Sequence, residues 1–198
     1  MTRRAISWDQ MLPLAPNGAG PVNCFALVTY IPYPLGAFLD SLRRELEPGC
    51  PPCRAHVTLL PPRPLQAEAG LAWTRIRERS QGFSSFAIEA HEVTLFEATS
   101  VIYVSVGEGS PDLRSAHERF NVEELGQREA FPYCPHITLA QTLKPEQIPA
   151  AMELAQRRWL GYQGPRRFLA RRFTFVQNTE NNCWRDLGEF TGEPTRTG

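Results

Sequence analysis

The spacing of apolar residues changes along this chain, and each change marks a predicted strand or helix. Residues 22–31 (VNCFALVTYI) are rich in β-branched and aromatic side chains, which predicts a strand. Apolar residues then recur at helical spacing from Leu35 to Leu46, and Pro48-Gly49 ends the predicted helix. A short apolar run over 55–60 predicts a second strand, which we expect to stop at Pro61-Pro62.

The same two patterns, helical spacing and short apolar runs, predict the remaining elements. Helical spacing predicts helices over 68–80, 111–122 and 145–160, and apolar runs predict strands over 83–96, 100–106, 135–140, 168–177 and 184–190. We expect 1–21 to be an irregular N-terminal arm, 22–190 a single bilobal domain and 191–198 a flexible tail.

One order of elements occurs twice: a strand, a helix, and a strand that carries the phrase His-x-Thr-Leu. The two copies cover 22–60 and 100–140. Such internal similarity predicts duplicated lobes with approximate two-fold symmetry. Symmetry of that kind brings equivalent strands to one shared cleft, so we expect both copies of the phrase to line it.

The repeated phrase supplies groups that can transfer protons. His56 and Thr58 share one face of their strand, as do His136 and Thr138, because alternate strand residues point the same way. Histidine titrates near neutral pH, so one ring can act as a base while the other acts as an acid. The threonine hydroxyls can donate to phosphate oxygens. These four residues fit phosphodiester cleavage without a metal ion.

Charge and composition exclude some classes of protein. The sequence has 21 basic and 21 acidic side chains and no net charge, which argues against a nonspecific nucleic-acid coat. A nucleotide or RNA end bound in a pocket remains compatible with this balance. No apolar stretch is long enough to span a bilayer, and residues 1–14 lack a signal core. We therefore expect a cytoplasmic protein without a membrane partner.

The cysteines leave an alternative open. Their odd count and irregular spacing do not suggest a disulfide framework, and Cys50 and Cys53 fit either free thiols in a loop or a redox or zinc site. A zinc site built from Cys50, Cys53, His56, Cys134 and His136 has suitable donors but gives the threonines no role. A catalytically silent module that binds nucleotides or RNA ends is a second alternative, and a scaffold whose histidines merely pack is a third.

The two phrases, their separation and the segment 131–140 (FPYCPHITLA) resemble the two-histidine (2H) phosphoesterase superfamily. Within it, the chain is most similar to the bacterial 2′-5′ RNA ligase and RNA cyclic phosphodiesterase group, over about 22–190. The resemblance implies an α+β, LigT-like fold in which two duplicated lobes with antiparallel sheets line a central groove and helices lie outside.

The resemblance also implies an activity. It implies that His56 and His136 are catalytic and that Thr58 and Thr138 bind phosphate. The expected reaction is hydrolysis of 2′,3′-cyclic phosphates to 2′-phosphates, or cleavage of 2′-5′ linkages, with ligation as the reverse. RNA ends or small cyclic and 2′-5′ nucleotides are the implied partners, with no cofactor, metal or obligate protein partner. By analogy, His136 is the base and His56 the acid.

Several other residues are candidates by position alone. Arg63 follows the first motif strand and either reaches a phosphate from the rim of the groove or is a solvated loop residue. Tyr133 either stacks on a base or packs under its strand. We expect Phe25, Tyr30 and Trp184 to belong to the core. His91, His117 and Lys144 are interpreted as surface or packing residues.

Overall fold

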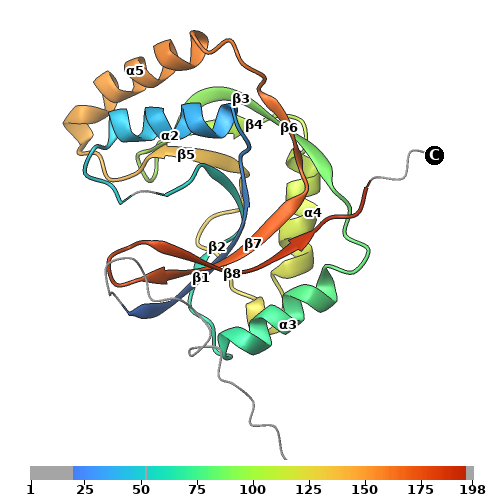
Figure 1. Ribbon diagram of the computed structural model, residues 1–198. Helices are drawn as coiled ribbons and strands as arrows, with labels where there is room; N and C mark the ends of the chain where they lie inside the picture. Colours follow the sequence, from blue (N-terminus) through green and yellow to red (C-terminus); the bar gives the residue numbers. More distant parts are fainter. Residues whose placement is uncertain (1–19, 52, 195–198) are drawn as a thin grey trace, which may run out of the picture.

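The computed structural model describes residues 20–51 and 53–194, which form two sheets with helices on their outer faces (Figure 1). The strands are β1 (Pro21–Tyr30), β2 (His56–Arg63), β3 (Phe86–Phe96), β4 (Val101–Val106), β5 (His136–Ala140), β6 (Arg167–Ala170), β7 (Arg172–Thr179) and β8 (Trp184–Thr191). The α-helices are α2 (Leu35–Leu46), α3 (Ala69–Arg79), α4 (Ser110–Phe120) and α5 (Ile148–Leu160). None of these helices is long and apolar enough to cross a membrane.

Each sheet has four strands, in the orders β2-β1-β7-β8 and β5-β4-β3-β6, and every pairing within them is antiparallel. The predicted α+β fold with antiparallel sheets is confirmed. Both strands that carry the repeated phrase are edge strands, and β2 lies against β5 where the two sheets meet. The topology therefore brings the two copies of the phrase together.

The helices of the two repeated units are exchanged between the sheets. Helix α2 follows β1 in the chain but packs on β5 and α5, whereas α4 follows β4 but packs on β2 (Figure 1). Trp73 of α3 stacks on Phe175 of β7, so α3 and α4 cover one sheet and α2 and α5 the other. Each sheet thus depends on a helix supplied by the other repeat.

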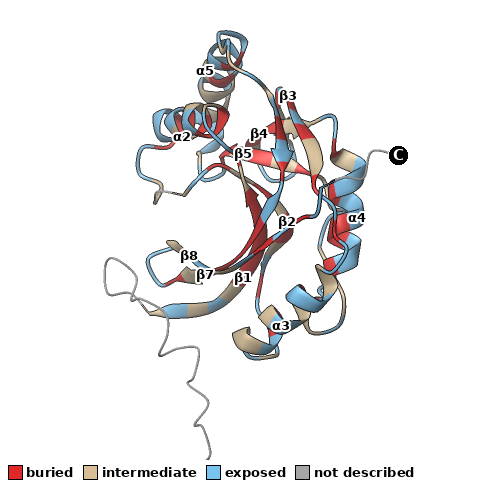
Figure 2. Cartoon of the chain, turned by 45° about the vertical axis from the view of Figure 1, so that its right-hand side comes forward, coloured by how far each residue is buried: buried red, intermediate tan, exposed pale blue. Residues whose placement is uncertain are grey.

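One main hydrophobic core runs through both sheets, as the buried positions in Figure 2 illustrate. Leu39 and Leu42 of α2, Ile102 of β4 and Phe173 of β7 are all completely buried within it. Helical spacing places the leucines on one stripe of α2, which explains why the helix buries that side. A core shared in this way fixes the distance between β2 and β5.

Several boundaries differ from the predicted ones by one to three residues, and three further differences have a structural cause. Strand β2 continues through Pro61-Pro62 to Arg63, because proline, which has no N–H to donate, is tolerated on an edge strand. The predicted strand over 168–177 is two strands, β6 and β7, which pair in different sheets. The predicted helix over 145–160 begins as a 3-10 turn, Pro145–Gln147, before α5.

The predicted terminal segments lie largely outside the described residues. Residues 1–19 of the arm and 195–198 of the tail are not described. The backbone beyond β8 is still paired, since the N–H of Gly192 donates to Arg171 and that of Glu193 donates to Phe83. The division into arm, domain and tail stays a prediction.

Candidate active site

The four residues of the repeated phrase line one cleft. It has a volume of about 370 Å³, and His56 and Thr58 of β2 share its lining with His136 and Thr138 of β5. Alternate side chains of these neighbouring edge strands point to the same space, as the sequence pattern predicts. Small-molecule sites commonly measure about 300–1,000 Å³, so the cleft can hold a nucleotide-sized group.

Both histidine rings are held in the same way. Nδ1 of His56 lies 2.7 Å from the carbonyl oxygen of Arg54, and Nδ1 of His136 lies 2.7 Å from that of Cys134. A carbonyl oxygen can only accept, so each Nδ1 carries a hydrogen and donates it. The neutral rings therefore keep an unprotonated Nε2, which can take a proton, and the charged rings carry an Nε2–H, which can give one.

The surroundings of the rings disfavour their charged forms. Burial lowers the pKa of His56 to about 4, and the positive charge of Arg43 adds to this effect. Burial also lowers the pKa of His136, although the carbonyl of Cys134 opposes the change. Both imidazoles are thus neutral near pH 7 in the free protein. A bound phosphate, which is negative, favours protonation of a neighbouring ring.

Aromatic side chains from the adjacent strands brace the two rings. Tyr30 is opposite His56 in the β1–β2 register, and its ring meets the imidazole edge to face with centroids 6.4 Å apart. Phe96 and Tyr103 stack on each other and meet His136 at 5.0 and 5.5 Å. These contacts limit rotation of both imidazoles, which helps to keep Nε2 directed at the cleft.

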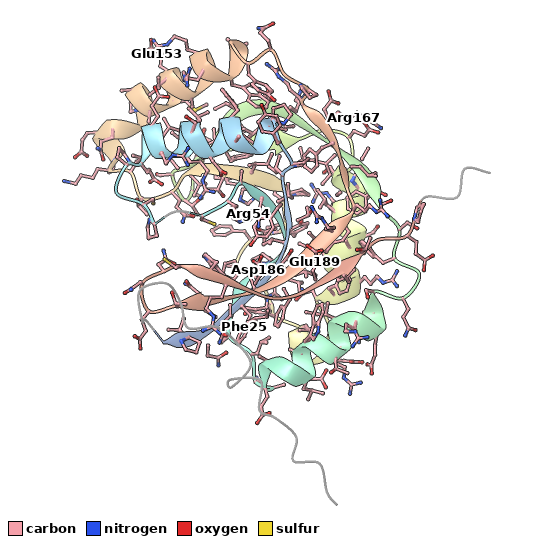
Figure 3. All side chains as sticks on the ribbon, in the orientation of Figure 1. Phe25, Arg54, Glu153, Arg167, Asp186 and Glu189 are labelled. Atoms are coloured by element: carbon pink, nitrogen blue, oxygen red, sulfur yellow. The ribbon has the colours of Figure 1, made fainter. Side chains whose placement is uncertain are left out.

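A polar cluster lies next to His56. The guanidinium of Arg54 lies 3.6 Å from the ring centroid of Tyr30, and the hydroxyl of Tyr30 donates to Asp186 Oδ1 over 2.6 Å. Arg54, just before β2, forms an ion pair with Asp186 of β8 at 3.9 Å (Figure 3). Burial and the hydrogen bond to Asp186 raise the pKa of Tyr30, so the phenol stays protonated.

One wall of the cleft is apolar and separate from the main core. Ala26 and Val28 of β1 and Val176 of β7 form it, and Tyr30 and Trp184 pack against them. The core position expected for Tyr30 and Trp184 is met only in part, since both pack on this smaller apolar cluster and also line the cleft. Tyr30 does so because β1 is apolar on both faces and alternate residues face the cleft. Phe25 does belong to the main core and stacks on Phe175.

Arg43 is a cleft residue that the sequence did not reveal. It lies in the last turn of α2, and its Nη1 donates to the carbonyl of Cys53 over 2.9 Å. Among the described residues that line the cleft, it is the one Lys or Arg side chain. Helix α2 has two arginines, and spacing alone does not distinguish Arg43 from Arg44. The position of Arg43 depends on where the exchanged helix packs.

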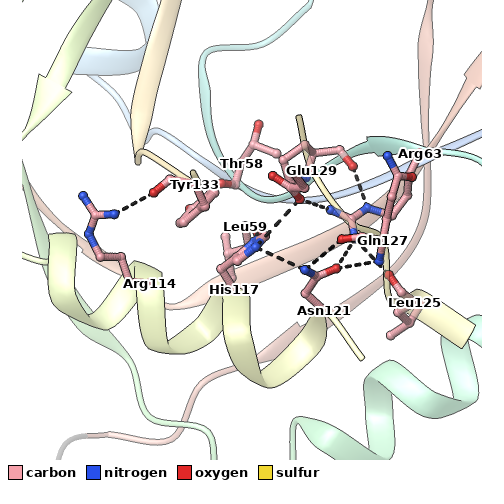
Figure 4. A network of polar contacts seen from close by, with 11 residues as sticks. Thr58, Leu59, Arg63, Arg114, His117, Asn121, Leu125, Gln127, Glu129 and Tyr133 are labelled. Atoms are coloured by element: carbon pink, nitrogen blue, oxygen red, sulfur yellow. Dashed lines mark hydrogen bonds and ion pairs between the residues drawn. The ribbon is translucent and has the colours of Figure 1, made fainter. Parts of the chain in front are cut away.

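Arg63 lies away from the cleft, and its side chain is 2% exposed. Its Nη2 forms an ion pair with Glu129 Oε1 at 2.6 Å, its Nη1 donates to Asn121 and to the carbonyl of Leu125, and its Nε donates to the carbonyl of Pro61 (Figure 4). All three guanidinium nitrogens are engaged. We therefore correct the expectation of a rim or solvated arginine: the strand runs on past the prolines and directs Arg63 inward.

Tyr133 lines the cleft, but its position is fixed by packing. Its ring stacks on His117 with centroids 4.1 Å apart, and its hydroxyl donates to the carbonyl of Thr58 over 2.7 Å. Nδ1 of His117 is 2.7 Å from the carbonyl of Leu59 (Figure 4). Tyr133 and His117 thus hold the motif strand β2 in place from beneath.

The cysteines near the cleft are free thiols. Cys50 donates to Glu47 Oε2 over 3.3 Å, and Cys53 Sγ lies 3.7 Å from His56 Nδ1. Burial raises the pKa of both thiols, which disfavours their thiolate forms. Within 20–51 and 53–194, no three His, Cys, Asp or Glu side chains are grouped as metal ligands would be.

Comparison with known proteins identifies relatives of this sequence. The sequence pattern of the 2′-5′ RNA ligase superfamily matches residues 31–182. Proteins of Staphylococcus aureus strains JH1 and Mu3, each named "Putative phosphoesterase", are 26% identical over 112 residues, or 56% of this chain. The match spans 66% of the length of these relatives.

Solved structures share the fold at low sequence identity. Apo LigT of E. coli superimposes with a TM-score of 0.60 at 13% identity, over 86% of this chain and 98% of LigT. The complex of E. coli LigT with 3′-AMP gives 0.58 at 12% identity, over 85% and 97% of the two chains. The LigT-like fold predicted from the repeated phrase is confirmed.

Proposed function

The chain belongs to the 2′-5′ RNA ligase superfamily, and on that premise we propose that it is a metal-independent phosphodiesterase. Its proposed substrates are 2′,3′-cyclic phosphates of RNA ends or nucleotides, and 2′-5′ linkages. The observation that carries the proposal is the pair of histidines on one cleft, each with Nδ1 held by the carbonyl two residues earlier. The E. coli LigT structures with 3′-AMP and ATP are consistent with a nucleotide ligand.

The proposed reaction on a cyclic phosphate needs one neutral and one charged ring. Nε2 of His136 takes a proton from a water molecule, whose oxygen attacks phosphorus. The bond from phosphorus to O3′ breaks, and Nε2–H of His56 gives its proton to O3′. The product is a 2′-phosphate with a free 3′-hydroxyl. The negative phosphate favours the protonated form of His56, which the free protein disfavours.

Hydroxyl and guanidinium groups are proposed to hold the phosphate. Thr58 and Thr138 each lie two residues beyond a histidine on the same strand face, so they can donate to the nonbridging oxygens. Hydrogen bonds to these oxygens strengthen as charge builds up in the transition state. Arg43, at the edge of the same cleft, adds a positive charge that favours an anionic ligand.

A panel of substrates tests the proposal. We expect turnover of 2′,3′-cyclic or 2′-5′-linked nucleotides, with the product phosphate on O2′ by NMR, and no turnover of 3′,5′-cyclic nucleotides. Binding of 2′,3′-cyclic nucleotides without any hydrolysis would instead favour the silent binding module. Activity should persist in excess EDTA, and loss of activity that added zinc restores would contradict the metal-independent reaction.

A further inference from the structure

A second cavity adjoins the cleft at the catalytic histidine of β5. Its volume is about 380 Å³, and His136 and Pro61 line both cavities. The rest of its lining is mainly apolar and includes Phe96, Phe131 and Pro132. Phe131 is 60% exposed, although a large apolar side chain usually gains by burial. An exposed aromatic ring beside a catalytic histidine indicates a place where a ligand packs.

The charges around this second cavity differ from those of the main cleft. No described residue in its lining is a Lys or Arg, whereas the main cleft has Arg43. The single carboxylate, Glu129, forms an ion pair with buried Arg63 at 2.6 Å. Thr99 and Gln127 provide neutral polar groups. The second cavity therefore suits an uncharged ring with hydroxyl or amide groups better than a second phosphate.

We propose that this cavity binds the nucleoside that carries the 5′-oxygen of a 2′-5′ phosphodiester, with Phe131 stacking on its base. The inference rests on the proposed function and narrows the substrate to a linkage with a nucleoside on each side of the phosphate. The main cleft then holds the nucleoside with the 2′-oxygen, beside the apolar wall and Trp184. His136 lies between the two cavities, at the scissile phosphate.

The chemistry agrees with this placement. In cleavage of a 2′-5′ linkage, the neighbouring O3′ attacks phosphorus and gives its proton to Nε2 of His56. The bond from phosphorus to O5′ breaks, and Nε2–H of His136 protonates O5′, which leaves a 2′,3′-cyclic phosphate. Water later enters where O5′ left, and His136 takes its proton. His136 therefore exchanges protons with both the leaving O5′ and the attacking water, as microscopic reversibility requires. Of the two histidines, His136 is the one that lines the second cavity.

The test compares a 2′-5′-linked diadenosine monophosphate with adenosine 2′,3′-cyclic phosphate, using Phe131→Ala, Ala98→Trp and Leu160→Ala variants. Phe131→Ala removes the stacking ring, and Ala98→Trp fills the cavity from the exposed turn after β3. Leu160→Ala is the matched control, because Leu160 is a 75% exposed apolar residue on α5 outside both cavities.

We expect both cavity variants to lower kcat/KM for the dinucleotide about tenfold relative to the cyclic mononucleotide, mainly by raising KM. Loss of one stacked base weakens binding by about that factor, and a filled cavity prevents the same stacking contact. A dinucleotide without the base on its 5′-linked side should show no such difference between wild type and Phe131→Ala. An equal effect on both substrates, or none, would overturn the subsite and leave the phosphodiesterase proposal intact. A wild-type protein that turned over neither substrate would overturn both.

Discussion

At the scale of single residues, the site depends on how each imidazole is oriented. The carbonyls of Arg54 and Cys134 hold Nδ1 of His56 and His136, and aromatic edges contact both rings. These contacts are the same in both repeats, although the residues that make them differ. The segment just before each motif strand therefore contributes as well: the residue two positions before each histidine selects its tautomer with a backbone carbonyl.

Replacement of either histidine should separate catalysis from binding. We predict that His56→Ala and His136→Ala each lower kcat by about 10²–10⁴-fold, the usual contribution of a general acid or base. Binding of a nucleoside 2′-monophosphate, measured by calorimetry, should persist because Thr58, Thr138 and Arg43 remain. His91→Ala is the control, since His91 is an exposed residue outside the cleft. Normal turnover by either motif variant would contradict the mechanism.

The lowered pKa of both histidines predicts proton uptake when an anion binds. The pKa of His56 is about 4 in the free protein and that of His136 is also lowered, so neither ring is charged near neutral pH. A bound anion raises the pKa of both histidines. A ligand that raises a pKa binds more tightly as pH falls toward the raised value. Sulfate, whose charge is constant in this range, should therefore bind better at about pH 6 than at about pH 8.

Calorimetry in two buffers of different ionisation enthalpy measures the protons taken up with sulfate. The double variant His56→Gln, His136→Gln should bind sulfate with no proton uptake and a weaker dependence on pH. If wild-type protein took up no protons on binding sulfate, the two rings would not lie close enough to the bound anion for its charge to raise their pKa.

At the scale of elements, buried ionic groups join segments that are distant in sequence. Arg63 at the end of β2 connects to Asn121 after α4 and to Glu129 in the loop before β5. We predict that Arg63→Ala destabilises the fold by about 3–5 kcal/mol, the usual cost of removing one partner of a buried ion pair. Urea unfolding measures this loss. A selective rise in KM with unchanged stability would favour the phosphate role expected from the sequence.

Glu47 makes a similar connection between the C-terminal end of α2 and the loop after β5. It is 9% exposed, and its Oε1 accepts from the N–H of Gln141 at 3.0 Å and from the hydroxyl of Thr142 at 2.8 Å. We predict that Glu47→Ala costs about 1–3 kcal/mol of stability, because it leaves these donors without their acceptor.

Glu45→Ala is the matched control for Glu47, on the same turn of the helix. Glu45 pairs with Arg158 at 3.0 Å, but both side chains are more than 40% exposed, so its loss should cost less than about 1 kcal/mol. Urea midpoints of the two variants give the comparison. Equal losses would show that the contacts of Glu47 contribute no more than an exposed pair.

These elements also show what the sequence could predict. Local periodicity placed β1 and α2 within one residue of their bounds, and the repeated phrase identified the strands that meet at the cleft. The sequence failed where the outcome depends on tertiary pairing. The split between β6 and β7, the inward direction of Arg63 and the presence of Arg43 in the cleft all follow from which sheet a segment joins, which local spacing does not encode.

At the scale of the whole molecule, the exchange of helices makes the two sheets interdependent. Helix α2 packs on β5 and α4 packs on β2, so each sheet buries its outer face with a helix from the other repeat. The main core accordingly contains residues of both sheets, such as Val57 of β2 and Ile137 of β5, which are completely buried. Neither repeat can bury its apolar surface alone.

Interdependence of this kind predicts one cooperative unfolding transition. Loss of α2 uncovers the sheet that contains β5, and loss of α4 uncovers the sheet that contains β2. A partly folded state with one intact sheet should therefore be unstable. Far-UV circular dichroism follows the helices, and fluorescence includes Trp73 beside β7 and Trp159 beneath β3, so the two signals report on both sheets. Their urea midpoints should coincide. Two separated transitions would mean that each sheet is stable without the exchanged helix, and the cleft between β2 and β5 would then owe its geometry to something other than the shared core.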